Sequence, residues 1–497
     1  MVLTKRFHRW ESTVIRLMGL LLLWTSLSML LPLGAAMYFQ EALEPFLFPI
    51  LTCFAVSIPL VLLFRTSSNI RPVEGIFIVS FSWIMVMFVG AMPYILSGMG
   101  AVDACFESMS GFTTTGASIM ADIESWPSSL LLWRSMTQWL GGAGIIMVFV
   151  TIFPILGIGG RNLFRNEGPS LDIHNFTVRI QEAAREFHVI YIALSAIMFV
   201  SLMLMGLEGM DAICITFSTI STGGFSPRAA SIGYYDPLVQ WLVIAFMFLG
   251  GTSFYLHYRA IYQRKPSYLK STEFRWVLSI ILLLTAATVA WRWSGFGVQD
   301  IGGFEALVRG SLFQTVSLFT STGFATEDYT LYPAPIIVLL FLMAFVGASS
   351  GSTAGGIKTA RIIIVARYFH NGLLKMLHPR AVMPVKFDAG SLNEDGLNSI
   401  ILVVMSFVLV LVSSTVLLTL VGLTPDMALS ASISSVSNIG PGVGYLGPYG
   451  SYASVDPLGK IVLTITMWAG RLEIMTVLVM LTPVFWKEMG RRGPKQI

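Results

Sequence analysis

The chain has 497 residues, of which 55% are hydrophobic and only 12% are charged. Soluble domains average about 25% charged residues, so this composition excludes an ordinary soluble protein and predicts an integral membrane protein with many spans. With 31 basic and 27 acidic residues, the net charge of +4 is too even for nucleic-acid binding. Three cysteines and six scattered histidines indicate neither a disulfide framework nor a metal or proton-relay site.

Ten apolar segments are long enough to cross a bilayer, and the eighth of them is interrupted. They lie near residues 17–39, 46–64, 75–97, 130–157, 189–207, 237–256, 276–293, 334–346 with 357–369, 399–421 and 459–485. The first segment is predicted to be a retained helix, because no convincing cleavage site precedes a polar mature start.

Basic residues cluster on alternate connections between these segments. The clusters lie at residues 5–16, 65–71, 161–185, 259–275, 358–386 and 487–495. The positive-inside rule then predicts that these connections and both termini face the cytoplasm.

The connections on the opposite side, after the third, fifth, seventh and ninth segments, are too apolar for exposed loops. Each is predicted to hold a short helix followed by a loop rich in Ser, Thr and Gly, and the candidate helix starts are Asp103, Asp211, Glu305 and Asp426. Aligned on one glycine each, the loops read FTTTGAS (112–118), TISTGGF (219–225), FTSTGFA (319–325) and VSNIGPG (436–442).

Such short helices cannot cross a bilayer, and irregular backbone at membrane depth is tolerated only inside protein or along a water-filled cavity. One such loop alone is more consistent with helix packing through small residues than with a pore. Four in register predict an internally repeated architecture around one shared pore.

The candidate filter residues are the glycine of each loop and the two residues before it. They are Thr114, Thr115 and Gly116; Ser221, Thr222 and Gly223; Ser321, Thr322 and Gly323; and Asn438, Ile439 and Gly440. Rings of backbone carbonyls on such loops replace the hydration shell of a monovalent cation. The preceding helices would point their partially negative C-terminal ends at the cavity, which also favours cations.

The motifs SGFTTTGAS, STISTGGFSP, TSTGFAT and SNIGPG resemble the Trk/Ktr/HKT superfamily of potassium transporters. The two extra N-terminal helices resemble those of the TrkH/TrkG-type pore subunit. The resemblance implies an all-α membrane protein with ten transmembrane helices and four pseudo-repeats of helix, pore loop and helix around a central pore. The expected divisions are an N-terminal hairpin (1–70) and repeats at 71–170, 171–270, 271–390 and 391–497, the last with a basic C-terminal tail.

The resemblance also implies a substrate, a location and partners. Glycine at position 116 argues for potassium over sodium, and the expected location is a bacterial inner membrane. Two pore subunits would assemble with a cytosolic TrkA-type regulatory subunit. The chain has no Rossmann or Walker pattern, so we expect no cofactor here and nucleotide only on the partner.

The eighth segment breaks at GASSGSTAGGIK, residues 347–358, which contains Gly347, Gly351, Gly355 and Gly356. Glycine costs about 1 kcal/mol relative to alanine inside a helix, so a continuous helix is not expected. A tight helix crossing, a kink or a helix-dimer contact are possible readings of the residues. The resemblance implies an intramembrane gating loop, with Lys358 placed to repel cations.

The last segment contains Arg471 in MWAGRLEIM, with Glu473 two residues later. A charge at membrane depth indicates function by default, although an ion pair with a carboxylate is the structural alternative. The resemblance implies a pore arginine that acts as an electrostatic barrier. Four other arginines are expected to be interfacial or loop residues: Arg134, Arg228, Arg292 and Arg309.

Three other functions are considered. A broken-helix secondary transporter of a small solute predicts intramembrane carboxylates or a substrate pocket, and the loops contain neither. A sodium-selective or cation-coupled symporter of the same fold is a nearer alternative. A membrane enzyme would need a catalytic cluster that the scattered histidines do not supply. Whether transport is passive or coupled does not follow from the sequence.

Overall fold

The computed structural model describes residues 9–64, 71–151, 173–265, 267–296, 301–381, 383–388 and 390–490. Within these residues the only β-structure is a small antiparallel hairpin of β1 (Lys386–Phe387) and β2 (Gly390–Ser391). The predicted all-α class is therefore confirmed. The helices are α1 (Arg9–Ser28), α2 (Leu30–Tyr38), α3 (Glu44–Leu63), α4 (Pro72–Leu96), α5 (Ala101–Phe112), α6 (Ser128–Thr151), α9 (Ile173–Leu204), α10 (Gly209–Ile220), α11 (Pro237–Gly250), α12 (Phe254–Ile261), α13 (Thr272–Phe296), α14 (Ile301–Phe319), α15 (Ala334–Val346), α16 (Thr359–Leu377), α17 (Glu394–Leu420), α18 (Pro425–Val436), α19 (Pro457–Arg471), α20 (Ile474–Met480) and α21 (Pro483–Gly490).

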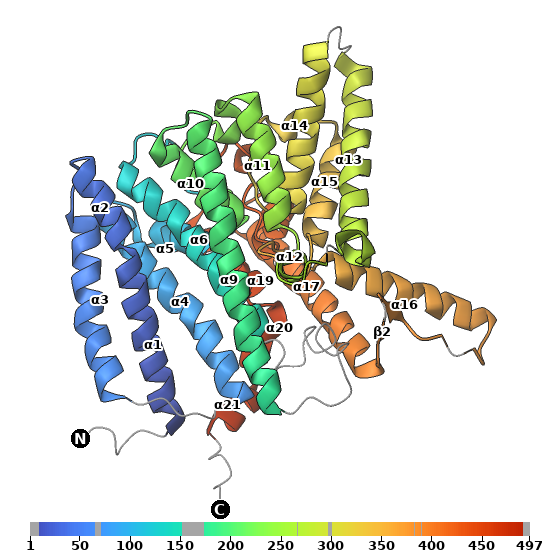
Figure 1. Cartoon of the computed structure of the whole chain (residues 1–497), viewed down its shortest axis with the longest axis horizontal. Helices are drawn as coiled ribbons and strands as arrows, with labels where there is room; N and C mark the ends of the chain where they lie inside the picture. The colour runs from blue at the N-terminus through green and yellow to red at the C-terminus, as the bar shows by residue number, and fades with distance from the viewer. Residues whose placement is uncertain are drawn as a thin grey trace, which may run out of the picture.

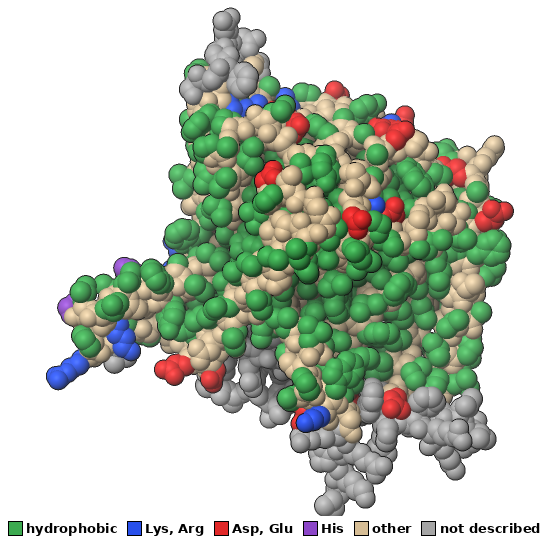
Figure 2. Space-filling model, turned by 180° about the vertical axis from the view of Figure 1, so that it is seen from behind, with side chains coloured by type: hydrophobic (Ala, Val, Ile, Leu, Met, Phe, Trp, Pro, Cys, Tyr) green, Lys and Arg blue, Asp and Glu red, His purple; other side chains and the backbone are tan. Residues whose placement is uncertain are grey.

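The outer surface is that of a multi-pass membrane protein. Six described helices are long and apolar enough to span a bilayer: Glu11–Tyr38, Glu44–Leu63, Pro72–Leu96, Ala184–Leu204, Thr272–Trp293 and Glu394–Leu420. Leucines on these helices face outward, and Leu62, Leu204 and Leu420 are 77%, 84% and 78% exposed. Figure 2 shows a broad hydrophobic belt with the charged side chains gathered mainly above and below it. A lipid environment is what stabilises such a surface.

Two further spans are bent, which the sequence did not predict. Helices α11 and α12 meet at 95°, and α19 and α20 meet at 112°. A Cβ on Gly251 would lie 2.6 Å from Cγ2 of Thr320, so glycine lets the first bend press against the end of α14. At the second bend Glu473 adopts a φ of 57°, which ends the helical hydrogen bonding. Counting each bent pair as one span gives up to eight spans among the described residues.

The two remaining predicted segments fall on α6 and on α15 with α16. Residues 152–157 of the former lie outside the described residues. Helix α15 has 13 residues, and after the loop at 347–358 helix α16 runs sideways, away from the helical bundle (Figure 1). Segment 357–369 is therefore not the continuation of a straight span.

Four helices lie inside the bundle: α5, α10 and α18 have 12 residues each, and α14 has 19. Each packs against three other helices. Helix α5 contacts α4, α6 and α19; α10 contacts α6, α9 and α11; α14 contacts α11, α13 and α15; and α18 contacts α15, α17 and α19. Their C-terminal residues are buried, as are the loops that follow them. This packing brings four loops that are distant in sequence to one central place.

The acidic residues predicted to start these helices lie near the helix N-termini, but they do not cap them. Asp103, Asp211 and Asp426 lie in first turns, but the N-caps of all three helices lack a side-chain hydrogen bond. Helix α14 begins earlier than predicted, so Glu305 lies beyond its first turn. Asp103 pairs with Lys460 at 2.6 Å, so this carboxylate ties α5 to α19 in addition to facing the helix dipole.

Candidate functional site

The four central loops share one backbone conformation. In each, the second residue after the end of the helix has a left-handed φ, and so does the glycine two positions later. The pairs are Thr114 (53°) with Gly116 (84°), Thr222 (52°) with Gly224 (81°), Ser321 (54°) with Gly323 (81°), and Asn438 (53°) with Gly440 (104°).

The second of these pairs corrects the alignment predicted from the sequence, which placed Gly223 with the other glycines. The amide of Gly223 donates to Ser218 O at 2.8 Å, just as Thr115 donates to Ser110 O at 2.8 Å. Gly223 is thus equivalent to Thr115, and Gly224 to Gly116. Thr222, not Ser221, therefore stands two positions before the equivalent glycine of the second loop, Gly224.

The loops touch in cyclic order, each glycine against the carbonyl of the next loop. A Cβ on Gly116, Gly224, Gly323 or Gly440 would collide with the carbonyl oxygen of Gly223, Thr322, Ile439 or Thr115, respectively. No larger residue fits this close approach with a positive φ. The four loops that contain the twelve predicted filter residues therefore touch one another in a closed ring.

Hydroxyl groups hold the loops from behind. Ser110 Oγ donates to Ala117 O at 2.6 Å, and Ser317 Oγ donates to Phe324 O at 2.6 Å. Thr113 and Thr115 share a hydrogen bond of 2.8 Å between their hydroxyls. These hydrogen bonds tie the hydroxyl groups of the loops to the surrounding protein, whereas Thr114 Oγ1 has no hydrogen-bond partner among the described residues.

The glycine-rich loop at 347–358 lies directly against this ring. Thr353 Oγ1 donates to Ile220 O at the end of α10 at 3.2 Å, and Gly355 N donates to Ser321 Oγ at 2.6 Å. A Cβ on Gly355 would collide with the carbonyl of Ser437. The loop thus contacts three of the four filter segments on the side where the short helices end.

One buried carboxylate joins this loop to the helix that follows it, α16. Glu273, at the start of α13, accepts hydrogen bonds from Ser350 N at 2.7 Å and Ala360 N at 3.2 Å. The preceding residue is fixed in turn, because Thr272 N donates to Asp388 Oδ1 in the β-hairpin at 2.9 Å. Glu273 is therefore one of several groups outside the glycine-rich loop that hold its conformation, together with Ser321 Oγ and the carbonyl of Ile220.

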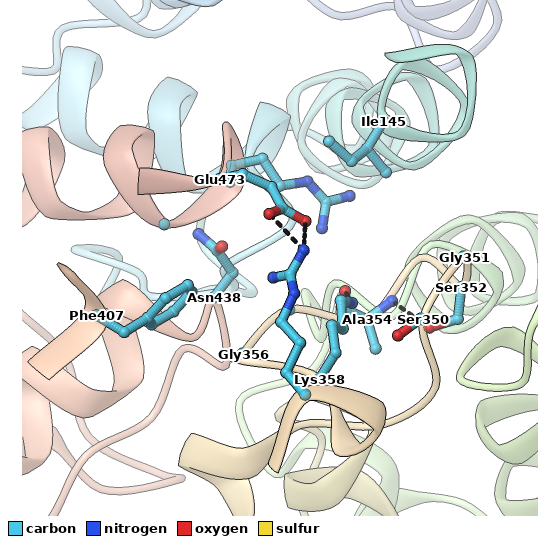
Figure 3. Close-up of a pocket in the computed structure, with 14 residues that line it drawn as sticks. Ile145, Ser350, Gly351, Ser352, Ala354, Gly356, Lys358, Phe407, Asn438 and Glu473 are labelled. Atoms are coloured by element: carbon cyan, nitrogen blue, oxygen red, sulfur yellow. Dashed lines mark hydrogen bonds and ion pairs between the residues drawn. The ribbon is translucent and has the colours of Figure 1, made fainter. Parts of the chain in front are cut away.

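A small cavity of about 40 Å³ lies between the loop, Asn438 and the bend of α19. Figure 3 shows Lys358, Asn438 and Glu473 around this space. Arg471 also lines it, is 4% exposed, and donates from Nη1 to Thr353 O at 2.8 Å. Lys358 Nζ donates to Ala354 O within the loop.

Arg471 does not pair with the carboxylate two residues away. Glu473 instead makes a bidentate ion pair with Arg361, with distances of 2.7 and 2.6 Å from Nη2. Among the described residues Arg471 forms no ion pair, and its Nε and Nη2 have no hydrogen-bond partner. Glu473 therefore does not form the ion pair that was the structural alternative for Arg471. Among the described residues no carboxylate pairs with the Arg471 guanidinium.

Several residues of this site escaped the sequence analysis. The alignment error had a visible signal: an apolar residue and a hydroxyl precede each loop at 112–113, 220–221, 319–320 and 436–437, and matching these selects Gly224. Arg134 is wrongly predicted as interfacial, since it is 2% exposed and paired with Glu107 at 2.6 Å. Only contacts between distant segments reveal this pair.

Known proteins resemble the chain over almost its whole length. Residues 46–487 match the TrkH family model, described as cation transport protein. The chain is 34% identical over 483 residues to the Trk system potassium uptake protein TrkH of Salmonella typhimurium, covering 96% of this chain and 99% of that protein. It is 31% identical over 495 residues to the Trk system potassium uptake protein TrkG of Escherichia coli, covering 95% and 98%.

The crystal structure of the potassium transporter TrkH from Vibrio parahaemolyticus superimposes with a TM-score of 0.87 at 31% identity, covering 96% of this chain and 99% of that one. These relatives are transport proteins and not enzymes. With a family match over most of its length and a fold shared end to end, the chain belongs to the TrkH family of cation transport proteins.

Proposed function

We propose that this chain takes up potassium across the membrane through a selectivity filter made by its four central loops. The observation that carries the proposal is the closed ring in which each loop glycine abuts the carbonyl of the next loop. In this proposal the four loops are pseudo-repeats around one pore, within ten transmembrane helices. The names of the relatives, which are potassium uptake proteins, support potassium as the cation.

We further propose that residues 347–358 form the gate, with Gly347, Gly351, Gly355, Gly356 and Lys358 shaping it. Its position against the filter and the dense glycine content support this role. Arg471 supplies the electrostatic barrier, because its charge is buried beside the gate and lacks a carboxylate partner.

The surroundings of the pore complete the proposal. The chain is placed in a bacterial inner membrane with both termini in the cytoplasm, as a homodimer regulated by a cytosolic TrkA-type subunit. Potassium is the substrate, the chain carries no cofactor of its own, and nucleotide binds only the partner. The alternating basic clusters support this orientation.

Ion flux into liposomes that contain the purified chain tests the proposed function. Potassium and rubidium are expected to pass much faster than sodium, because a rigid carbonyl cage discriminates by size and field strength. Equal or preferred sodium flux would favour a sodium-selective protein of the same fold. A dependence of potassium flux on a proton or sodium gradient would indicate coupled transport. Absence of flux, with folded protein in the membrane, contradicts the proposal.

Replacing Glu273 by alanine is expected to raise potassium flux in the absence of a regulatory subunit. The substitution leaves the amide of Ser350 in the gate and that of Ala360 at the start of α16 without this acceptor, and an unsatisfied buried donor costs about 1–3 kcal/mol. The loop should then leave its position against the filter more often. Glu273→Gln keeps one acceptor oxygen and should have a smaller effect. Glu394→Gln is the control, because Glu394 is likewise a carboxylate at the start of a long apolar helix, α17. Equal flux in all variants would contradict the role of Glu273.

A further inference from the structure

Each pair of neighbouring filter loops is joined by hydrogen bonds outside the ring itself. Loops 2 and 3 are joined where Ile232 N and Gly233 N donate to Ala325 O at 3.0 and 3.1 Å. Loops 3 and 4 are joined by Tyr329 OH, which donates to Gly442 O at 2.9 Å. Loops 4 and 1 are joined by Tyr452, whose amide donates to Ser118 O at 2.8 Å. These hydrogen bonds use neutral groups only. The ion pair of Asp103 with Lys460 also joins α5 to α19, but Lys460 donates to Ala453 O and not to one of the four loops.

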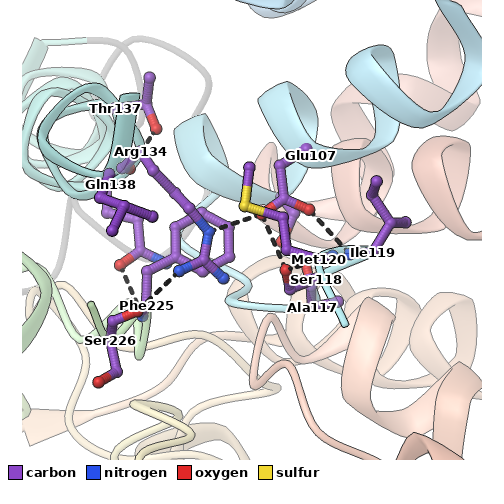
Figure 4. Close-up of polar contacts among 12 residues, drawn as sticks. Glu107, Ala117, Ser118, Ile119, Met120, Arg134, Thr137, Gln138, Phe225 and Ser226 are labelled. Carbon is purple, nitrogen blue, oxygen red and sulfur yellow. Dashed lines mark hydrogen bonds and ion pairs between the residues drawn. The ribbon is translucent and has the colours of Figure 1, made fainter. Parts of the chain in front are cut away.

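The connection between loops 1 and 2 is ionic. Glu107 on α5 accepts from Ile119 N at 2.9 Å and from Ser118 Oγ at 3.0 Å, which fixes the chain leaving loop 1. Arg134 on α6 donates from Nε to Glu107 at 2.6 Å and from Nη1 to Ser226 O, just after loop 2, at 3.0 Å. Figure 4 shows Arg134 reaching toward Glu107 on one side and toward Phe225 and Ser226 on the other.

The same helix contacts loop 2 again one turn later. Gln138 donates from Nε2 to Gly223 O at 2.6 Å and accepts from Phe225 N at 3.0 Å. Gly223 O is the carbonyl that abuts Gly116, so this hydrogen bond acts on the ring directly. The Arg134 guanidinium also lies 3.6 Å from the ring centroid of Phe225. One face of α6 therefore positions loop 2 relative to loop 1.

Stability alone does not explain a buried ion pair of this kind. Removing two charges from water is costly, and an apolar pair of similar size is often as stable. The side chains of Arg134 and Glu107 are 3% and 0% exposed. In the corrected alignment the positions equivalent to Glu107 are Ile215, Gln314 and Ala431, so the other short helices carry no charge there. Among these four equivalent positions, only the one beside loop 1 carries a charge, and its partner Arg134 reaches loop 2.

We propose that Glu107 and Arg134 are specificity-determining positioning residues that set the spacing of loops 1 and 2 and thereby the discrimination between potassium and sodium. The proposal rests on the proposed function. Charge-assisted hydrogen bonds are shorter and stiffer than neutral ones, so they hold a cage dimension more firmly. A cage held less firmly contracts around the smaller cation and loses its preference.

The test is the ratio of potassium to sodium flux in liposomes for Glu107→Gln, for Arg134→Met and for the double variant. Each single variant is expected to lower the ratio by about tenfold, equivalent to ~1.4 kcal/mol in relative barrier height. The double variant leaves no unpaired charge, so its thermal stability should recover toward that of the wild type. Its flux ratio should stay low, because Ser226 O still lacks its donor.

The ion pair of Glu305 and Arg309, 2.8 Å apart on α14, provides the matched control because neither side chain bonds to the filter backbone. Glu305→Gln with Arg309→Met should leave the flux ratio unchanged. A wild-type ratio in the Glu107 and Arg134 variants, or a ratio that recovers together with stability in the double variant, overturns the proposal. A wild-type protein that does not favour potassium defeats the proposed function instead, so the two failures are distinguishable.

Discussion

Replacing Gly224 by alanine is expected to reduce potassium flux roughly a hundredfold, equivalent to ~2.7 kcal/mol in barrier height. Its φ of 81° alone costs an alanine about 1–2 kcal/mol. The new Cβ would also collide with the carbonyl of Thr322, a member of the ring, and displace it. Potassium flux into liposomes, normalised to the amount of folded protein, measures the effect.

The neighbouring glycine provides the control. Gly223→Ala places its Cβ against the end of the Gln138 side chain, and Gly223 does not have a left-handed φ. Moving Gln138 strains its two hydrogen bonds to loop 2, so some flux should be lost. The loss should still be smaller, because a side chain moves aside more easily than a backbone carbonyl held in a ring. If Gly223→Ala were the more damaging of the two, the corrected alignment of loop 2 would be wrong.

Replacing Arg471 by alanine is expected to raise cation flux roughly tenfold. At an effective dielectric constant of 20, a unit charge repels a cation 4 Å away by about 4 kcal/mol. Removing the charge from the cavity beside the gate relieves part of that repulsion, and it also removes the hydrogen bond to Thr353 O. Flux without a regulatory subunit is the appropriate measurement.

Arg471→Lys separates the two contributions. Lysine keeps the charge but presents a compact ammonium in place of the planar guanidinium. If electrostatic repulsion dominates, flux through this variant stays close to that of the wild type. Equal flux through Arg471→Ala and the wild type would contradict the barrier.

Much of the architecture could be predicted because the membrane makes sequence patterns strong. Apolar length and alternating basic clusters are enough to propose spans and sides. The bends at Gly251 and Glu473 escaped prediction because each depends on packing against another segment. The hydrophobic pattern continues across both breaks, so composition alone shows one span where the structure has two helices.

The candidate site shows the same division. Thr114, Ser321 and Asn438 are recognisable because a local motif surrounds each. In the second loop two consecutive glycines shifted the predicted alignment by one position. Glu273 and Glu107 carry no local motif at all. Each acts on amides that lie far along the chain, 77 residues away for Ser350 and 12 for Ile119. Such contacts appear only once the chain is folded.

The closed ring of loops is built from a single polypeptide, so its four quarters are inherited separately. In a filter assembled from four identical chains, one codon change alters every quarter at once. Here one codon change alters one quarter, and the other three keep their geometry. The fourth loop illustrates this freedom, because it carries Ile439 and Pro441 while retaining the same backbone conformation at Asn438 and Gly440. Selection can therefore adjust the ring of loops one quarter at a time.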